Sequence, residues 1–201
     1  LKPDVILSTG DLLDRGIMEW GKTTAIMRSL TAPGGKYAVM GNHEFISGEK
    51  YAVRFHKDAG FELIRNGVLT LKQYNISLVG VDDLTMQRKR GNKYPELSLL
   101  KGLPRDRFVL VMKHQPFVSP KGPGLFDLQL SGHTHAGQIF PFRLFVALMF
   151  PDLSGLFDKG KGSWLYVNQG TGTWGPPMRL FTPPEITVIE IIRGRPPGSD
   201  K

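Results

Sequence analysis

The sequence predicts an α/β layered domain that contains a mixed sheet, and three observations lead to this fold class. Short apolar runs that end in glycine or polar residues recur along the chain, as buried strands do. Segments with helical spacing of apolar residues alternate with them early, and strands dominate late. A length of 201 residues suits one domain with a sizeable core. We expect residues 1–192 to form this domain and residues 193–201 to be a disordered tail.

The expected elements follow from local patterns. Residues 5–8 form an apolar run that ends at Gly10 and predicts a buried strand. In residues 19–30 the apolar side chains have helical spacing, and the sequence TAPGG stops that helix. Residues 107–114, RFVLVMKH, carry the strongest buried-strand pattern. The other expected strands are residues 36–40, 67–83 (two strands joined at Tyr74-Asn75), 127–133, 164–170 and 186–192, and the other expected helices are residues 48–60 and 96–103.

Composition and charge exclude some chemistries. The chain has no cysteine, so disulfides and zinc–thiolate sites are excluded and a metal would need histidine, carboxylate or amide ligands. The net charge of +8 suits contact with nucleic acid, anionic lipid or phosphorylated substrates, but it is equally typical of a basic soluble protein. No apolar run reaches the roughly 20 residues that a membrane-spanning helix needs.

Polar residues able to bind a metal follow four of the expected strands. A lone histidine is weak evidence, but four of the five histidines lie at such strand ends. Ligands of α/β sheets collect outside the carboxyl ends of strands, so these residues are expected to meet in one cleft. They are Asp11, Asp14 and Arg15 in GDLLDR, Asn42, His43 and Glu44 in GNHE, His114 in KHQP, and His133 and His135 in GHTH.

The residue types indicate the chemistry. Aspartate, asparagine and histidine without thiolate suit manganese, iron or zinc. An aspartate can bridge two ions about 3.5–4 Å apart, an arrangement that suits phosphoester hydrolysis. In an extended strand end, His133 and His135 would point to opposite faces, so the turn after Gly132 must bring both into the cleft.

In this order, the four motifs resemble those of the calcineurin-like metallophosphoesterase superfamily. The resemblance implies a four-layer α/β/β/α sandwich of two mixed sheets and two divalent ions, Mn, Fe or Zn, in the intact protein. It implies that Asp11 bridges both ions, that Asn42, His114 and His133 complete one site, and that His135 serves the other. It also implies that His43 lies near the leaving group as a general acid, oriented by Asp14.

One family motif is missing. The family carries D-x-H on a strand upstream of GD..D, and here no aspartate has a histidine two residues later. Only ten residues precede Asp11, too few for that strand and the helix after it. We therefore expect a chain truncated at its N-terminus, without the first strand, with one complete metal site and weak or no activity alone. The alternative is a natural one-metal or non-catalytic binding module.

Two segments bear on the substrate. Residues 139–151, IFPFRLFVALMFP, are expected to be either a core segment or an exposed apolar lip that docks on a membrane or grips acyl chains. With residues 168–191, GHTHAGQI resembles a bacterial branch of phosphodiesterases that often carry an N-terminal membrane segment. The resemblance implies a membrane-proximal lipid phosphoester and a peripheral or tethered location. Arg15, Trp174 and Arg179 are expected to bind substrate.

Three further expectations complete the sequence-based picture. A phosphodiesterase is the first choice of activity, and a nuclease is a weaker one because no basic groove interleaved with aromatic residues is visible. His56 is expected on a helix surface or helix end with no metal role. Asp82 and Asp83 are expected to form a turn.

Overall fold

The computed structural model describes residues 1–14, 20–83, 95–192 and 194. The helices are α1 (Trp20–Ser29), α2 (Asn42–Ser47), α3 (Glu49–Ala59), α5 (Glu96–Lys101) and α6 (Phe142–Met149), with the 3-10 turns η1 (Lys72–Tyr74) and η2 (His135–Gly137). The strands are β1 (Ile6–Ser8), β2 (Lys36–Ala38), β3 (Glu62–Leu63), β4 (Gly67–Leu71), β5 (Ile76–Val81), β6 (Phe108–Lys113), β7 (Leu128–Ser131), β8 (Gly155–Gly160) and β9 (Ser163–Val167).

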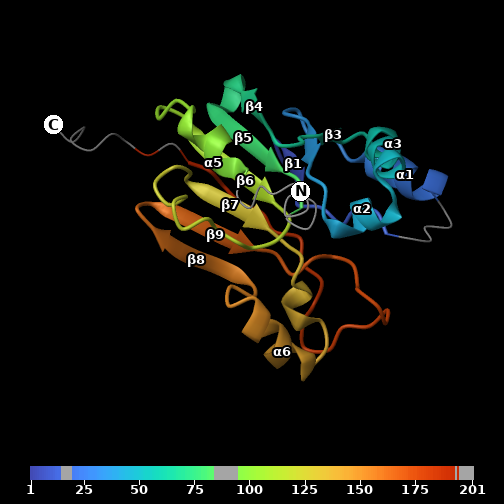
Figure 1. Cartoon of the computed structure of the whole chain (residues 1–201). Coiled ribbons are helices and arrows are strands. Elements are labelled where there is room, and N and C mark those ends of the chain that lie inside the picture. Colours follow the sequence, from blue (N-terminus) through green and yellow to red (C-terminus); the bar gives the residue numbers. More distant parts are fainter. Residues whose placement is uncertain (15–19, 84–94, 193, 195–201) are drawn as a thin grey trace.

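The smaller sheet has the order β1-β2-β3, and its strands are parallel. Parallel neighbours need crossover connections, and here α1 and the α2–α3 pair supply them. Figure 1 shows α1 and α3 side by side against this sheet. Phe55 of α3 is fully buried there with Ala38 and Met40, so the apolar face of α3 covers the outer face of the sheet.

The larger sheet has the order β4-β5-β6-β7-β9-β8, with parallel pairing from β5 to β9 and antiparallel strands at both edges. Its central strands are buried on both faces, as continuous apolar runs predict. Leu110 and Met112 of β6 face the smaller sheet, whereas Val109 and Val111 face Leu100 of α5.

These contacts define four layers: α1 and α3, the smaller sheet, the larger sheet, and α5 (Figure 1). The predicted α/β sandwich of two sheets is confirmed, with mixed pairing in the larger sheet and parallel pairing in the smaller one. The predicted tail, residues 193–201, lies outside the described residues except for Gly194.

The strand predicted at residues 186–192 does not form. The alternation of apolar and polar residues satisfies the local pattern, but a strand also needs a backbone partner. Among the described residues, no backbone hydrogen bond holds this segment, and Ile186 and Val188 remain exposed. Only its beginning is fixed, by a side-chain hydrogen bond between Asn168 and Thr187.

The segment predicted as either core or an exposed lip is exposed. Residues 142–149 form α6, which has no buried residue. Its C-terminal neighbour Phe150 packs on Phe117 with ring centroids 5.3 Å apart, so the helix is attached at that end. Figure 1 shows α6 projecting beyond the sheets, away from α1 and α3.

Candidate metal centre

The polar loops that follow β1, β2, β6 and β7 meet at one edge of the sandwich. The backbone N–H of Gly132 donates to the carbonyl of His114 at 2.9 Å, which joins the loops after β6 and β7. His114 Nδ1 lies 2.9 Å from the Thr9 carbonyl, which joins this pair to the loop after β1. The strand-end rule thus places the predicted ligands together even though they come from two sheets.

Glycine permits the close approach of the loops that follow β1 and β2. A Cβ atom on Gly41 would lie 2.1 Å from Asp11 Oδ1, and one on Gly10 would lie 2.5 Å from the Gly41 nitrogen. These separations are far below van der Waals contact, so side chains at either position would push the loops apart.

Three ligand atoms converge around His114 Nε2, which is itself the fourth. Asp11 Oδ2 lies 2.9 Å from this nitrogen. Asn42 Oδ1 lies 3.2 Å from it, and His133 Nδ1 lies 3.1 Å from it. All four belong to the predicted site, and His114 is almost completely buried. Asp11, His114 and His133 form a group whose ligand atoms all lie within 4.8 Å of one another.

This spacing fits one metal ion. Ligands at 2.0–2.2 Å from an ion and at right angles to one another would be about 3 Å apart. The Thr9 carbonyl accepts a hydrogen bond from Nδ1 of His114, so this ring presents Nε2 to the ion, as metal-binding histidines commonly do. An aspartate, an amide oxygen and two imidazoles suit manganese, iron or zinc.

Asp11 and His114 form a charged pair. Burial of the ring lowers the pKa of His114, but the adjacent Asp11 carboxylate raises it, and the resulting pKa is about 9. Burial raises the pKa of Asp11, whereas the charge and hydrogen bond of His114 lower it to about 2. Burial and the neighbouring His114 charge lower the pKa of His133 to about 4, so His133 is neutral at pH 7.

The backbone is left-handed at three predicted ligands. Asp11, His133 and His135 have φ values of 56°, 70° and 48°, a region that non-glycine residues seldom occupy. Such conformations cost of order 1–3 kcal/mol each, and they concentrate at functional sites. In the GHTH turn these left-handed conformations interrupt the extended backbone, in which successive side chains point to opposite sides. His133 and His135 therefore need not point to opposite faces.

Glu44 organises the site, and its role was not predicted. Its buried carboxylate accepts backbone hydrogen bonds from Asp11 and Gly41 at 2.8 Å, and from Leu12 and Leu13 at 2.8 and 3.1 Å. It therefore fixes the loops that carry Asp11 and Asn42. Its position three residues after Gly41, at the start of α2, fits a capping box and was the available sequence signal.

His43 and Asp14 lie beside the converging ligands. His43 Nδ1 is 2.7 Å from Asp14 Oδ1, and the His43 backbone N–H donates to Asp11 Oδ1 at 2.9 Å. The His43 side chain is 20% exposed, so substrate can reach it. Aspartate holding one ring nitrogen leaves the other for proton transfer.

His135 is outside the compact ligand group. Its Nδ1 accepts a hydrogen bond from Arg179 Nη2 at 3.2 Å. Arg179 also donates to the Gln169 carbonyl at 2.9 Å, which locks the loop after β9 to the GHTH turn. Burial and the Arg179 charge lower the pKa of His135 to about 4. Arg179 is thus engaged by the protein, and its predicted substrate role would require its release from these contacts.

Trp174 and Arg15 are the other two residues predicted to bind substrate, and only Trp174 is described by the structure. Trp174 is 63% exposed, and Gln138 holds its backbone by accepting from its N–H and donating to its carbonyl. The indole is therefore presented on a fixed loop near the GHTH turn. Arg15 lies outside the described residues.

Three residues of the secondary predictions are buried, which the sequence did not indicate, although His56 does lie in the last turn of its helix, one of the two predicted positions. His56 is fully buried in α3, with Nδ1 2.8 Å from the Ala52 carbonyl and Nε2 3.8 Å from Glu44 Oε1. His56 lies on the face of α3 that packs against the core. The sequence pattern did not predict this, because histidine is polar and seldom marks a buried helix face. Asp82 and Asp83 are also buried: Arg65 donates two hydrogen bonds to Asp82, and Gln115 donates to Asp83 at 2.8 Å.

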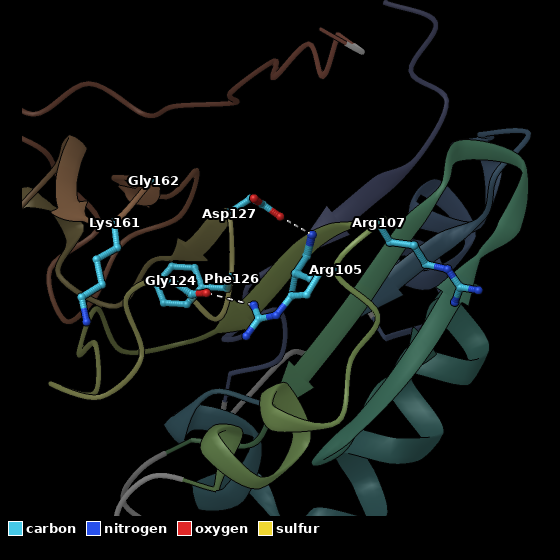
Figure 2. A pocket seen from close by; sticks show the side chains of 8 residues that line it. Arg105, Arg107, Gly124, Phe126, Asp127, Lys161 and Gly162 are labelled. Carbon is cyan, nitrogen blue, oxygen red and sulfur yellow. Dashed lines mark hydrogen bonds between the residues drawn. The ribbon is translucent and has the colours of Figure 1, made fainter. Parts of the chain in front are cut away.

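A separate pocket of about 130 Å³ lies at the opposite edge of the larger sheet (Figure 2). Its lining residues lie before β6, β7 and β9 or at the start of β6, whereas the metal ligands follow β6 and β7. Arg105 donates to the Gly124 carbonyl at 2.9 Å, and Figure 2 shows Arg107 pointing away from Lys161. The cations do not converge on a common point, and none of the predicted site residues lines this pocket.

The two-sheet fold and the Asp-Asn-His-His cluster at its strand ends define a metal-dependent phosphoesterase type of site. A family model described as calcineurin-like phosphoesterase matches residues 1–137. The chain belongs to this family, and the predicted resemblance is confirmed. The family implies divalent metal ions, and the cluster at His114 is a site that fits one.

Curated relatives cover nearly the whole chain. An uncharacterized metallophosphoesterase of Aquifex aeolicus is 33% identical over 94% of this chain and 73% of its own length. One of Helicobacter pylori is 35% identical over 94% of this chain and 51% of its own length. A "transmembrane protein with metallophosphoesterase domain" of Danio rerio is 31% identical over 95% of this chain and 46% of its own length. The chain thus spans about half the length of the latter two relatives.

Among solved structures, a 5'-nucleotidase precursor of Thermus thermophilus superposes with a TM-score of 0.48 and 16% identity. The superposition covers 83% of this chain and 39% of that one.

Proposed function

We propose that this chain carries the metal-binding part of a phosphodiesterase whose intact centre holds two divalent ions. Asp11, Asn42, His114 and His133 would hold one ion, and Asp11 and His135 would contribute to the second. The observation that supports this most directly is the convergence of three ligand atoms within 3.2 Å of His114 Nε2. Ions held there would supply Lewis-acid activation of the phosphoester and of water.

His43 is proposed as the general acid. Its ring is oriented by Asp14 at 2.7 Å and is partly exposed beside Asp11. As the bond between phosphorus and the leaving oxygen breaks, the free ring nitrogen of His43 would donate a proton to that oxygen. Asp14 would keep the ring in the donating orientation and stabilise its charged form, which makes Asp14 a positioning residue.

We further propose that the substrate is a lipid or another membrane-proximal phosphoester. The exposed helix α6 follows the GHTH turn, and Trp174 lies exposed on the loop held by Gln138. The name of the Danio rerio relative also places a metallophosphoesterase domain in a transmembrane protein. Within the described residues of this chain, no helix has the length and apolar character needed to cross a bilayer. A peripheral or tethered location is therefore part of the proposal.

The first test is the metal content of the purified chain after loading with manganese. About one ion per chain, lost in His133→Ala, is the expected result. Two ions would mean that residues beyond the compact cluster complete a second site. No ion in the wild-type chain would contradict an independently formed site. Glu62→Gln, on the short strand β3, serves as the control for manganese bound nonspecifically by surface carboxylates.

Activity is tested on bis(p-nitrophenyl) phosphate and p-nitrophenyl phosphate, with the chain alone and with a longer protein that has a D-x-H strand added at its N-terminus. The expected outcome is weak turnover of the diester by the chain and strong turnover by the longer protein. Preference for the monoester would overturn the diesterase assignment.

A one-metal binding module is the second candidate. Among the described residues, Asp11, His114 and His133 form the one compact group of titratable metal ligands, and His135 is bound to Arg179. Tight binding of one ion without hydrolysis by the longer protein would favour this candidate.

A further inference from the structure

An exposed apolar surface lies beside the metal centre, and two separate segments build it. We call it the apolar lip and define it as Phe142, Leu144, Phe145 and Leu148 of α6 with Trp174 and Phe181 of the following loop. All six side chains are at least 60% exposed, and Leu148 and Phe181 reach 82% and 80%. Large contiguous apolar surfaces on soluble domains commonly mark interaction sites.

The structure holds the two segments together. Ile139 and Leu180 form a parallel bridge, and the Leu180 N–H donates to the Gln138 carbonyl at 2.9 Å. The rings of Phe140 and Phe181 lie with centroids 6.3 Å apart. Figure 1 shows α6 and this loop on the same side of the molecule. The apolar lip is therefore one joined surface, whose apolar side chains face outward.

Charge distinguishes this region from an ordinary exposed surface. Residues 128–151 and 159–184 contain no aspartate or glutamate, whereas the net charge of the chain is +8. Arg143 is exposed within α6, whereas Lys159 is paired with Asp152 at 2.5 Å and Lys161 lies at the opposite edge of the larger sheet. An apolar helix that carries one exposed arginine and no acidic residue matches a negatively charged bilayer interface, because apolar side chains enter the acyl boundary while the arginine attracts anionic headgroups.

The lip is also continuous with the metal centre. Phe150, directly after α6, packs on His133 with ring centroids 5.1 Å apart. On the other segment, Arg179 contacts His135. A surface seated on the lip would thus lie next to the predicted ligands.

From this combination we infer that the apolar lip docks on the surface of an anionic lipid bilayer. Docking on a bilayer goes beyond the proposed hydrolysis, because it requires only the apolar lip and Arg143. It would bring a phosphoester in the headgroup layer toward the centre.

The test is flotation of the purified chain with phosphatidylcholine vesicles that contain or lack phosphatidylglycerol. Binding is expected only to the anionic vesicles and is expected to weaken as salt rises. Phe145→Ser/Leu148→Ser should reduce the bound fraction by about tenfold, because two inserted side chains are lost. Ile26→Ser/Leu30→Ser removes two exposed apolar residues from the other end of the molecule and should leave binding unchanged.

Folding and assembly are checked on the same samples. Both double variants should keep the circular dichroism, manganese content and bis(p-nitrophenyl) phosphate turnover of the wild type. Failure of flotation with intact metal binding would overturn docking and the peripheral location but leave the metal site and hydrolysis standing. Flotation without metal binding in the wild type would leave docking standing and overturn the proposed metal site. Equal flotation of Phe145→Ser/Leu148→Ser would contradict a role of the lip. Sedimentation showing a dimer that this variant dissociates would assign the lip to a second copy of the chain and overturn the proposal.

Arg143→Gln separates charge from apolar insertion. It should weaken flotation at low salt and lose its effect at high salt. An unchanged salt dependence would show that the cation within α6 takes no part in docking.

Discussion

His114 Nε2 lies 2.9 Å from Asp11 Oδ2, and this contact joins the two sheets at the metal centre. Asp11 follows β1 of the smaller sheet, whereas His114 follows β6 of the larger sheet. In the metal-free chain the two side chains stabilise each other as an ion pair, with the pKa of His114 raised to about 9. A metal ion and the His114 proton therefore compete for the same nitrogen.

Metal binding is accordingly expected to release about one proton per ion at pH 7–8. His114 is protonated there, whereas the pKa of His133 is about 4 and that ring has no proton to release. The apparent affinity should rise about tenfold per pH unit below 9. Calorimetry in buffers of different ionisation enthalpy measures the released protons. Asn42→Ala should weaken binding but keep the proton count, and a count near zero in the wild type would contradict the charged pair.

The stability of the metal-free chain should fall as pH rises from about 6.5 to 9. A raised folded-state pKa contributes stability that is complete below the ordinary value of 6.5 and is lost as the pH passes through about 9. The lowered pKa values of Asp11, His133 and His135 act in the opposite direction and only at lower pH, below their ordinary values. Thermal unfolding in chelator across this range is the measurement. His114→Asn should flatten the profile, and an equally steep profile in this variant would assign the effect to another group.

Glu44→Gln is expected to destabilise the chain by about 2–3 kcal/mol, because the amide cannot accept all four backbone hydrogen bonds that the buried carboxylate accepts. Manganese affinity should fall about 10- to 100-fold, since Glu44 holds the loops that carry Asp11 and Asn42. Denaturant unfolding and metal titration measure the two effects. Glu49→Gln removes an exposed partner of Arg65 and should cost less than about 1 kcal/mol, with unchanged metal affinity. Equal effects of the two substitutions would contradict the special role of Glu44.

His43→Gln should reduce the diester turnover of a protein extended by a D-x-H strand by about 10²- to 10⁴-fold while metal content stays unchanged, because it removes the proposed general acid. Asp14→Asn should cause a smaller loss, since it removes only the group that orients the ring. Turnover of a diester with a very acidic leaving group should be affected least, because that leaving group needs no proton. A uniform loss across leaving groups would assign His43 to binding rather than to proton transfer.

The ligands were predictable from the sequence because each motif follows a strand, and the carboxyl ends of parallel strands share an edge. That rule placed Asn42, His114 and His133 in one cleft, and the family resemblance assigned them to one ion. The clamp formed by Glu44 was less visible, because its partners are backbone N–H groups that leave no mark on side-chain identity. The buried position of His56 was missed for a related reason, since only tertiary packing decides which helix face is covered.

The segment 186–192 shows the limit of local patterns. Its alternation is typical of a strand, but pairing depends on a neighbour elsewhere in the chain, and none of the described strands pairs with it. The left-handed backbone of His133 and His135 was equally hidden. A turn that both follows a strand and redirects two side chains is set by the surrounding packing rather than by the residues themselves.

Gly41→Ala should abolish manganese binding, although the substitution adds only one methyl group. The new Cβ would lie 2.1 Å from Asp11 Oδ1 and 2.8 Å from the Asp11 backbone nitrogen. Glu44 holds the backbone nitrogens of Asp11 and Gly41, so the two loops cannot separate without breaking these hydrogen bonds. Gly21→Ala is the matched control, because a Cβ there meets nothing within 4 Å and alanine favours the helix α1. We expect the control to keep full metal content and to gain up to about 1 kcal/mol of stability. Metal analysis and unfolding of both variants decide the point: full manganese content in a folded Gly41→Ala chain would show that the loops can separate without loss of the site.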